Sequence, residues 1–135
     1  MKESPEQRSR IMRTVKSRDT APELIVRRLA HSMGYRFRLH RKDLPGNPDL
    51  VFAGLRKVIF VHGCFWHGHS CARGARVPKA NRDYWLKKIA GNKVRDRNSL
   101  KKLVAEGWTS LVVWECHIGN ASKLEAKVRE FLSAA

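Results

Sequence analysis

The chain has 135 residues, which is enough for one domain with a buried core. Its 42% share of hydrophobic residues predicts a folded protein and excludes a chain that is disordered throughout. The net charge of +16 is spread along almost the whole sequence, so we expect a polyanion as partner, with nucleic acid first and an anionic membrane surface second.

The sequence has no apolar span long enough to cross a membrane, and Met1–Pro5 lacks the apolar core of a signal peptide. We therefore expect a cytoplasmic protein with no membrane association and one domain over residues 1–135. The three cysteines are an odd number, which in a reducing compartment favours thiolate ligands over disulfides.

Two helices are predicted at the start of the chain. Residues 1–18 form a basic arm, whose helix over 5–18 is either a solvated face or a contact with a nucleic-acid groove. Thr20 and Glu23 fit a capping box, which alone accounts for Glu23, and the helix that they begin is expected to end at Gly34.

Three strands and a loop come next. Aromatic or apolar residues alternate with arginine over 35–39, which predicts a half-exposed strand. The apolar runs at 49–53 and 57–62 predict two further strands that pair as a hairpin. Residues 63–81 are expected to form a loop.

The last part of the chain predicts two helices around one strand. A long basic helix is expected over 83–106, ended by Gly107. Its predicted apolar stripe consists of Leu86, Ile89, Val94, Leu100, Leu103 and Val104. The continuous apolar run at 108–114 predicts a central strand, and 122–132 predicts a closing helix. The fold class is therefore α/β, with a mixed sheet flanked by helices.

Cysteines and histidines suggest a metal site in the loop. Cys64, His69 and Cys71 lie close together in sequence, and Cys116 follows the last strand, from which it can reach that loop across the sheet. Three thiolates and one imidazole make a closed tetrahedral zinc site of the structural kind. Alternatively, the cysteines are small buried hydrophobes, and His67 competes with His69 as the fourth ligand.

A second group of residues suits hydrolysis of a phosphodiester. Asp49 begins an apolar strand, where an isolated carboxylate is costly to bury, and the paired strand ends at His62. Mg²⁺ takes one or two carboxylates and leaves its other positions to water and phosphate. His62 and His67 are suited to moving protons near neutrality. The alternatives are a turn aspartate that accepts backbone N–H groups, and histidines that bind zinc or lie at the surface. We interpret His31, His40 and His117 as ordinary.

Large aromatic residues flank the polar part of the loop. Phe65 and Trp66 lie inside it, and Tyr84 and Trp85 begin the long helix. They either form a local core under the metal loop or stay exposed and wedge between base pairs.

Together these residues resemble the Vsr-type very short patch repair endonucleases, which nick DNA at T:G mismatches. The resemblance covers roughly Arg8 to Cys116. It rests on Arg8-Ser9-x-x-Met12, Arg18-Asp19-Thr20-Ala21-x-Glu23, Leu44-Pro45-Gly46-x-Pro48-Asp49, the run from Val58 to Cys71, and Val112-Val113-Trp114-Glu115-Cys116.

The resemblance implies a restriction-endonuclease-like fold in which Asp49 is followed by the altered signature Phe60-Val61-His62. It implies Mg²⁺ on Asp49 and on the backbone carbonyl of Val61, which stands where threonine is common in the family. It further implies His62 and His67 as catalytic residues. The implied zinc ligands are Cys64, His69, Cys71 and Cys116.

For DNA, the resemblance implies that Phe65, Trp66 and Trp85 intercalate beside the mismatch. It also places the helix containing Met12 in the minor groove and gives Glu23 and Asn92 supporting roles at the active site. The expected partners are double-stranded DNA and other mismatch-repair proteins, and the expected state is a monomer.

We therefore predict a Mg²⁺-dependent endonuclease that nicks one strand of duplex DNA at the T:G mismatches left by deamination of 5-methylcytosine. Either His62 or His67 takes the proton of the attacking water. The alternatives are a site-specific nicking or restriction endonuclease that acts on matched DNA, and a zinc-stabilised DNA-binding protein without catalysis.

Overall fold

The structure is a computed structural model that describes residues 20–64, 67, 69, 71 and 77–134. The helix predicted over 5–18 lies outside these described residues, and so do Met12, Phe65 and Trp66. None of the helices within the described part is long and apolar enough to cross a membrane.

The described elements form the mixed α/β domain that the sequence predicts. In chain order they are α2 (Ala21–Ser32), β1 (Arg38–Leu39), β2 (Leu50–Phe52), β3 (Lys57–His62), α3 (Arg82–Ala105), β4 (Thr109–Trp114) and α4 (Ala121–Ser133). Short 3-10 turns lie at Ala53–Leu55 and Glu115–His117. Gly34 and Gly107 take positive φ angles of 87° and 86° just after α2 and α3, as expected of glycines that end helices.

The sheet is mixed and has the strand order β1-β2-β3-β4. β1 and β2 are antiparallel, and β2 and β3 form the predicted antiparallel pair. β3 and β4 are parallel and pair from Lys57 opposite Thr109 to His62 opposite Trp114. A parallel pair needs a long crossover, which α3 supplies, and it brings the carboxyl ends of both strands to the same edge of the sheet.

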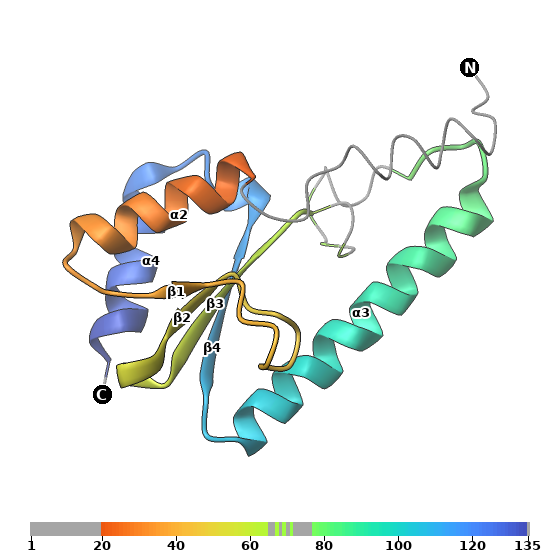
Figure 1. The fold of residues 1–135 in the computed structure, drawn as a ribbon. Coiled ribbons are helices and arrows are strands. Elements are labelled where there is room, and N and C mark those ends of the chain that lie inside the picture. The colour runs from red at the N-terminus through yellow and green to blue at the C-terminus, as the bar shows by residue number, and fades with distance from the viewer. Residues whose placement is uncertain (1–19, 65–66, 68, 70, 72–76, 135) are drawn as a thin grey trace.

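Helices cover both faces of the sheet (Figure 1). On the face of α2 and α4, the buried core consists of Val26, Ala30, Leu50, Phe52, Ile59, Val113, Leu124, Val128 and Leu132. On the face of α3, the core consists of Leu44, Val51, Val58, Phe60, Leu103 and Trp108. Alternate residues of β2 and β3 therefore face opposite cores, as the two-residue period of a strand requires.

The prediction that residues 108–114 form a central strand was wrong. Among the described strands, β4 lies at the end of the sheet and pairs with β3 alone. Its apolar run has another cause: Val113 belongs to the core under α2 and α4, and Val112 packs against the core under α3. A strand covered by helices on both faces needs apolar residues throughout, even at the edge.

The predicted apolar stripe of α3 was correct only in part. Ile89 and Leu103 are 7% and 0% exposed, but Leu86, Val94 and Val104 are 41%, 51% and 68% exposed. The amino-terminal half of α3 extends away from the sheet (Figure 1), so that half has less sheet to cover. Val104 follows Leu103 directly and is therefore turned by about 100° from the buried side.

Lys57, at the start of β3, is a buried cation that holds the end of α4. It is 7% exposed, and its Nζ donates to the carbonyl oxygens of Phe131 at 2.6 Å, Leu132 at 3.4 Å and Ala134 at 2.5 Å. The last carbonyl groups of a helix lack partners within the helix and carry partial negative charge, so the ammonium group stabilises this terminus.

We expect Lys57→Met to lower the free energy of unfolding by about 2–3 kcal/mol, because it removes charge-assisted hydrogen bonds and leaves buried carbonyl groups unpaired. The measurement is urea unfolding followed by circular dichroism. Lys101→Met, at an exposed position of α3, is the matched control and should change stability by less than about 0.5 kcal/mol. Equal effects of the two substitutions would contradict the capping role.

Candidate active site and metal centre

Asp49 lies directly before β2 and is fixed against β3. Its Oδ2 accepts a hydrogen bond from the backbone N–H of Val61 at 2.6 Å, and its own N–H donates to the carbonyl oxygen of Ile59 at 3.1 Å. The next residue after Val61 is His62, so this pairing fixes the Asp49 carboxylate against the backbone at the end of β3, one residue before the predicted catalytic histidine.

Glu23 of α2 is the second carboxylate at this site. Thr20 accepts a hydrogen bond from the Glu23 N–H at 3.4 Å, which is one half of the predicted capping box. The Glu23 side chain is buried, forms an ion pair with Arg27, and lies 2.9 Å from Nε2 of His40. Side-chain atoms of Glu23, His40 and Asp49 all lie within 4.8 Å of one another.

The structure therefore places His40, which the sequence analysis interpreted as ordinary, beside both carboxylates. One signal for this contact was available in the sequence. The predicted strand 35–39 ends directly before His40, and the next predicted strand begins at Asp49, so pairing of these two strands would place the residues side by side. Antiparallel pairing of β1 with β2 brings these two residues together, and the His40 N–H donates to the Asp49 carbonyl oxygen at 3.2 Å.

The environment of Asp49 opposes its negative charge. Burial raises the pKa of Asp49 to about 7, and the nearby Glu23 adds to this rise, although the hydrogen bond from Val61 lowers the pKa. A bound cation would relieve this cost, because it favours the ionised carboxylate. Two close carboxylates are also the ligand type that Mg²⁺ prefers.

His62 and His67 form a stacked pair of imidazoles. Their ring centroids are 3.8 Å apart and their planes differ by 3°. Nδ1 of His67 lies 2.6 Å from Oδ2 of Asp96, a residue of α3 that the sequence analysis missed. Asp96 follows Asn92 by four residues, so the two share one side of α3, and this spacing was the signal available in the sequence.

The two histidines have different surroundings. His62 is 7% exposed, and its Nδ1 has no hydrogen-bond partner among the described residues. Burial, together with neighbouring His67, lowers the pKa of His62 to about 4, although Asp96 acts in the opposite direction. His62 is therefore a neutral imidazole at physiological pH, while His67 has a carboxylate to orient its ring.

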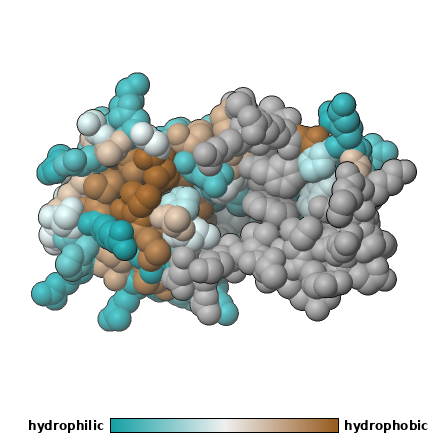
Figure 2. All heavy atoms as spheres, turned by 90° about the horizontal axis from the view of Figure 1, so that it is seen from above, coloured by the Kyte–Doolittle hydropathy of each residue, from teal (hydrophilic) through white to brown (hydrophobic). Residues whose placement is uncertain are grey.

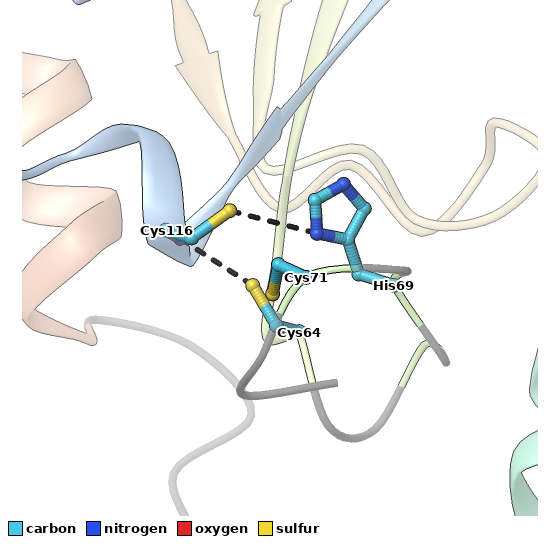
Figure 3. Close-up of side chains that lie close together, drawn as sticks. All are labelled: Cys64, His69, Cys71 and Cys116. Atoms are coloured by element: carbon cyan, nitrogen blue, oxygen red, sulfur yellow. Dashed lines mark hydrogen bonds between the residues drawn. The ribbon is translucent and has the colours of Figure 1, made fainter. Parts of the chain in front are cut away.

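Three cysteines and one histidine meet beside this pair (Figure 3). The ligand atoms of Cys64, His69, Cys71 and Cys116 lie within 4.8 Å of one another. Cys116 Sγ is 3.5 Å from Nδ1 of His69, and the Cys116 N–H donates to Cys64 Sγ at 3.4 Å. The His69 ring stacks on Trp114, with centroids 4.2 Å apart.

The parallel pairing of β3 and β4 explains this meeting. Cys64 follows the end of β3 and Cys116 follows the end of β4, so two distant parts of the sequence leave the sheet at the same edge. Burial raises the pKa of the Cys64 thiol to about 12, and neighbouring Cys71 and Cys116 contribute. A thiolate here therefore needs a cation, which makes the cluster suited to a metal ion.

Two further residues named by the sequence analysis lie on α3. Trp85 is 6% exposed and contacts Tyr84 edge to face, so intercalation would require the Trp85 ring to move outward. Asn92 is half-buried, and its Oδ1 accepts a hydrogen bond from Arg95. The DNA-contacting roles of both residues remain predictions.

Hydrophilic side chains are exposed on the described part of the surface. In the view of Figure 2, hydrophilic side chains project from the rim of the described surface, around a mainly apolar area. With a net charge of +16, such a surface attracts the phosphates of a nucleic acid over a broad area. Paired carboxylates and a stacked pair of imidazoles are groups that suit phosphodiester hydrolysis, so the class of protein that the site and the charge indicate is a nuclease.

Comparison with known proteins identifies the family. The family model described as DNA mismatch endonuclease Vsr matches residues 2–73, which is just over half of the chain. The chain belongs to this family.

Three curated relatives match over most of this chain. A type II nicking enzyme, V.XorIIP of Xanthomonas oryzae pv. oryzae, is 54% identical over 96% of this chain and 94% of the relative. The type II nicking enzyme V.NmeAIP of Neisseria meningitidis is 40% identical over 94% of this chain and 93% of the relative. The DNA mismatch endonuclease Vsr of Escherichia coli is 44% identical over 87% of this chain and 74% of the relative.

Proposed function

We propose that this protein nicks one strand of duplex DNA at T:G mismatches in a Mg²⁺-dependent reaction. The observation that carries the proposal is the 2.6 Å contact between Nδ1 of His67 and Oδ2 of Asp96, because it supplies an oriented proton acceptor in a chain that also holds the paired carboxylates of Glu23 and Asp49. The mismatch specificity rests on the family description and on the name of the Escherichia coli relative. The restriction-endonuclease-like fold is part of the same proposal.

Asp49 and the backbone carbonyl of Val61 would hold the metal, and the Glu23 carboxylate beside Asp49 would complete the site. The Val61 N–H points toward Asp49. In an extended strand, the N–H and C=O groups of one residue point to the same side, so the Val61 carbonyl is also directed to the Asp49 side. When bound, Mg²⁺ polarises the phosphoryl group and neutralises its developing charge.

The two histidines would divide the proton chemistry. Asp96 fixes Nδ1 of His67, which leaves Nε2 of His67 to accept the proton of the attacking water, as in other acid–base pairs with an orienting carboxylate. His62 is neutral because of its burial and is suited to a hydrogen bond with the phosphate or the leaving oxygen. His67 is therefore our choice for the general base.

Zinc on Cys64, His69, Cys71 and Cys116 would stabilise the loop that carries His67. Three thiolates and one imidazole form a closed structural zinc site. Phe65 and Trp66, which lie outside the described residues, belong to the same loop and would intercalate beside the mismatch with Trp85. The arm containing Met12 would contact the minor groove.

The test of the function uses labelled duplexes of one sequence that contain T:G, other mismatches or a matched T:A or C:G pair. Each duplex is incubated with the protein and Mg²⁺, and nicking of each strand is followed under single-turnover conditions. We expect cleavage of the T-containing strand at T:G and at least about tenfold slower cleavage of matched DNA. Equal rates on T:G and matched duplexes would contradict the mismatch specificity.

A site-specific nicking endonuclease on matched DNA is the second candidate. The names of the relatives from Xanthomonas oryzae and Neisseria meningitidis, both type II nicking enzymes, favour it. Incubation of supercoiled plasmids with the protein and Mg²⁺ distinguishes the candidates, because sequence-specific nicking would relax a fully matched plasmid at defined positions.

We expect Asp96→Asn to lower the single-turnover nicking rate by roughly 10²-fold or more, because oriented acid–base catalysis contributes about 10²–10⁴-fold. Duplex binding, measured by fluorescence anisotropy, should stay within about twofold of wild type. Asp83→Asn, on the exposed first turn of the same helix, is the matched control. Similar rates for the two variants would remove Asp96 from the mechanism.

A further inference from the structure

His40 occupies an unusual backbone position next to the carboxylates. Its φ angle is 50°, in the left-handed region that non-glycine residues seldom adopt. Its N–H donates to the Asp49 carbonyl oxygen at 3.2 Å, so the backbone of His40 is fixed to the residue that begins β2. The left-handed conformation turns the chain at the end of β1 and holds His40 next to Asp49.

The His40 side chain connects this strand end to α2. Its Nε2 lies 2.9 Å and 3.0 Å from the two carboxylate oxygens of Glu23. The side chains of His40 and Glu23 are 16% and 2% exposed, so the contact is largely shielded from water. A hydrogen bond in such surroundings is strong and directional, and it sets the orientation of the carboxylate plane.

Glu23 needs such partners because it has lost nearly all its hydration. Arg27, one helical turn further along α2, forms an ion pair with the same carboxylate. That pair belongs to one helix and can move with it. The His40 contact comes from the residue that follows β1, whose N–H is bonded to Asp49, so it links the Glu23 carboxylate to the start of β2.

We propose that His40 is a positioning residue for the proposed reaction. It holds the Glu23 carboxylate in the orientation in which Glu23 and Asp49 together bind the divalent cation and its water. Nε2 of His40 faces both Glu23 oxygens as a donor, so His40 acts through Glu23 and is not itself a ligand of the cation. This inference rests on the proposed function. In it, His40 does not bind the metal but orients a residue that does.

The test compares three substitutions in the full-length protein. His40→Ala removes the donor, and His40→Gln keeps an N–H donor at a similar distance from the backbone. His31→Ala is the matched control, because His31 is an exposed histidine of α2 outside the site. Single-turnover nicking of a T:G duplex is measured over a range of Mg²⁺ concentrations, together with duplex affinity and melting temperature.

For His40→Ala we expect the Mg²⁺ concentration at half-maximal rate to rise by about tenfold or more, as is typical when an outer partner of a metal ligand is lost. His40→Gln should recover most of this loss, and His31→Ala should match wild type. Duplex affinity should stay within about twofold of wild type in all three variants. A purely structural role of His40 would lower the melting temperature without changing the Mg²⁺ requirement.

A double-mutant cycle tests whether His40 acts through Glu23. In a Glu23→Gln background, His40→Ala should add little further loss, because the group that it positions has already changed. Independent, multiplying losses would overturn the inference, as would a His40→Ala variant with a wild-type Mg²⁺ requirement. Nicking by Asp49→Asn at the wild-type rate would instead overturn the proposed function, so the two failures are distinguishable.

Discussion

Asp49→Asn is expected to abolish nicking and, at the same time, to make the protein more stable at pH 8. The loss of activity follows from the loss of the proposed metal anchor. Metal-assisted stabilisation of the transition state is worth several kcal/mol, and each 1.4 kcal/mol is a factor of ten, so the rate should fall by roughly 10³-fold or more. Duplex binding should remain nearly intact, because the phosphate contacts come from basic residues elsewhere.

The gain in stability follows from the direction of the pKa shift. The pKa of Asp49 rises from 3.8 to about 7 in the folded protein. At pH 8 the carboxylate is ionised in both states, and its burial destabilises the fold by up to a few kcal/mol, at about 1.4 kcal/mol per pKa unit. As the pH falls through 7, the folded protein takes up a proton while the unfolded chain does not, so wild-type stability rises.

Asparagine has nearly the same shape as aspartate, and its side-chain oxygen can still accept the hydrogen bond from the Val61 N–H, but it carries no charge. The difference in unfolding free energy between Asp49→Asn and wild type should therefore be largest at pH 8 and small at pH 5. Urea unfolding in Mg²⁺-free buffer at both pH values measures it. Asp43→Asn, at a side chain that is 61% exposed, is the matched control and should show no such pH-dependent gain.

Either half of this prediction can fail separately. Nicking by Asp49→Asn at a near wild-type rate would show that the metal is held elsewhere. A variant that is less stable than wild type at pH 8 would show that the buried carboxylate is well compensated by its neighbours. The expected combination of lost activity and gained stability is the pattern of a residue retained for function.

The sequence predicts most of this fold because the relevant signals are local. The hairpin of β2 and β3, the crossover helix α3 and the closing helix α4 each have a clear periodicity and a glycine or turn at their ends. The position of β4 could not be predicted in the same way. Its apolar run results from burial on both faces of the sheet. That burial does not depend on whether the strand has one neighbouring strand or two.

The residues of the site also differ in how far the sequence could predict them. Cys64, His69 and Cys71 lie close together in the sequence of one loop. Cys116 joins them because β3 and β4 are parallel neighbours that end at the same edge of the sheet. His40 and Asp96 belong to no local sequence motif, and only tertiary contacts bring them to the site. His40 lies beside Asp49 because β1 pairs with β2, and Asp96 contacts His67 because of where α3 packs.

The second large effect is expected from removal of the thiolate cluster. The purified protein should contain about one zinc per chain, and Cys116→Ser should lose most of it. The binding free energy of a structural zinc ion contributes directly to folding, so the variant should melt at a clearly lower temperature. His67 lies between the ligands Cys64 and His69 in sequence, so loss of the metal should also misplace His67 and reduce nicking.

Four variants and the wild-type protein, compared by zinc content, test this prediction. Zinc content is measured by plasma mass spectrometry on freshly purified protein that has not met a chelator. Cys116→Ser and His69→Gln should both be deficient in zinc, whereas His117→Gln should retain it, because His117 contacts the His69 ring edge to face but lies outside the four-residue cluster. Asp49→Asn should keep its zinc while losing activity, which separates the structural metal from the catalytic one. Wild-type protein without zinc, or a Cys116→Ser variant with a full complement, would show that the cysteines are simply buried apolar side chains.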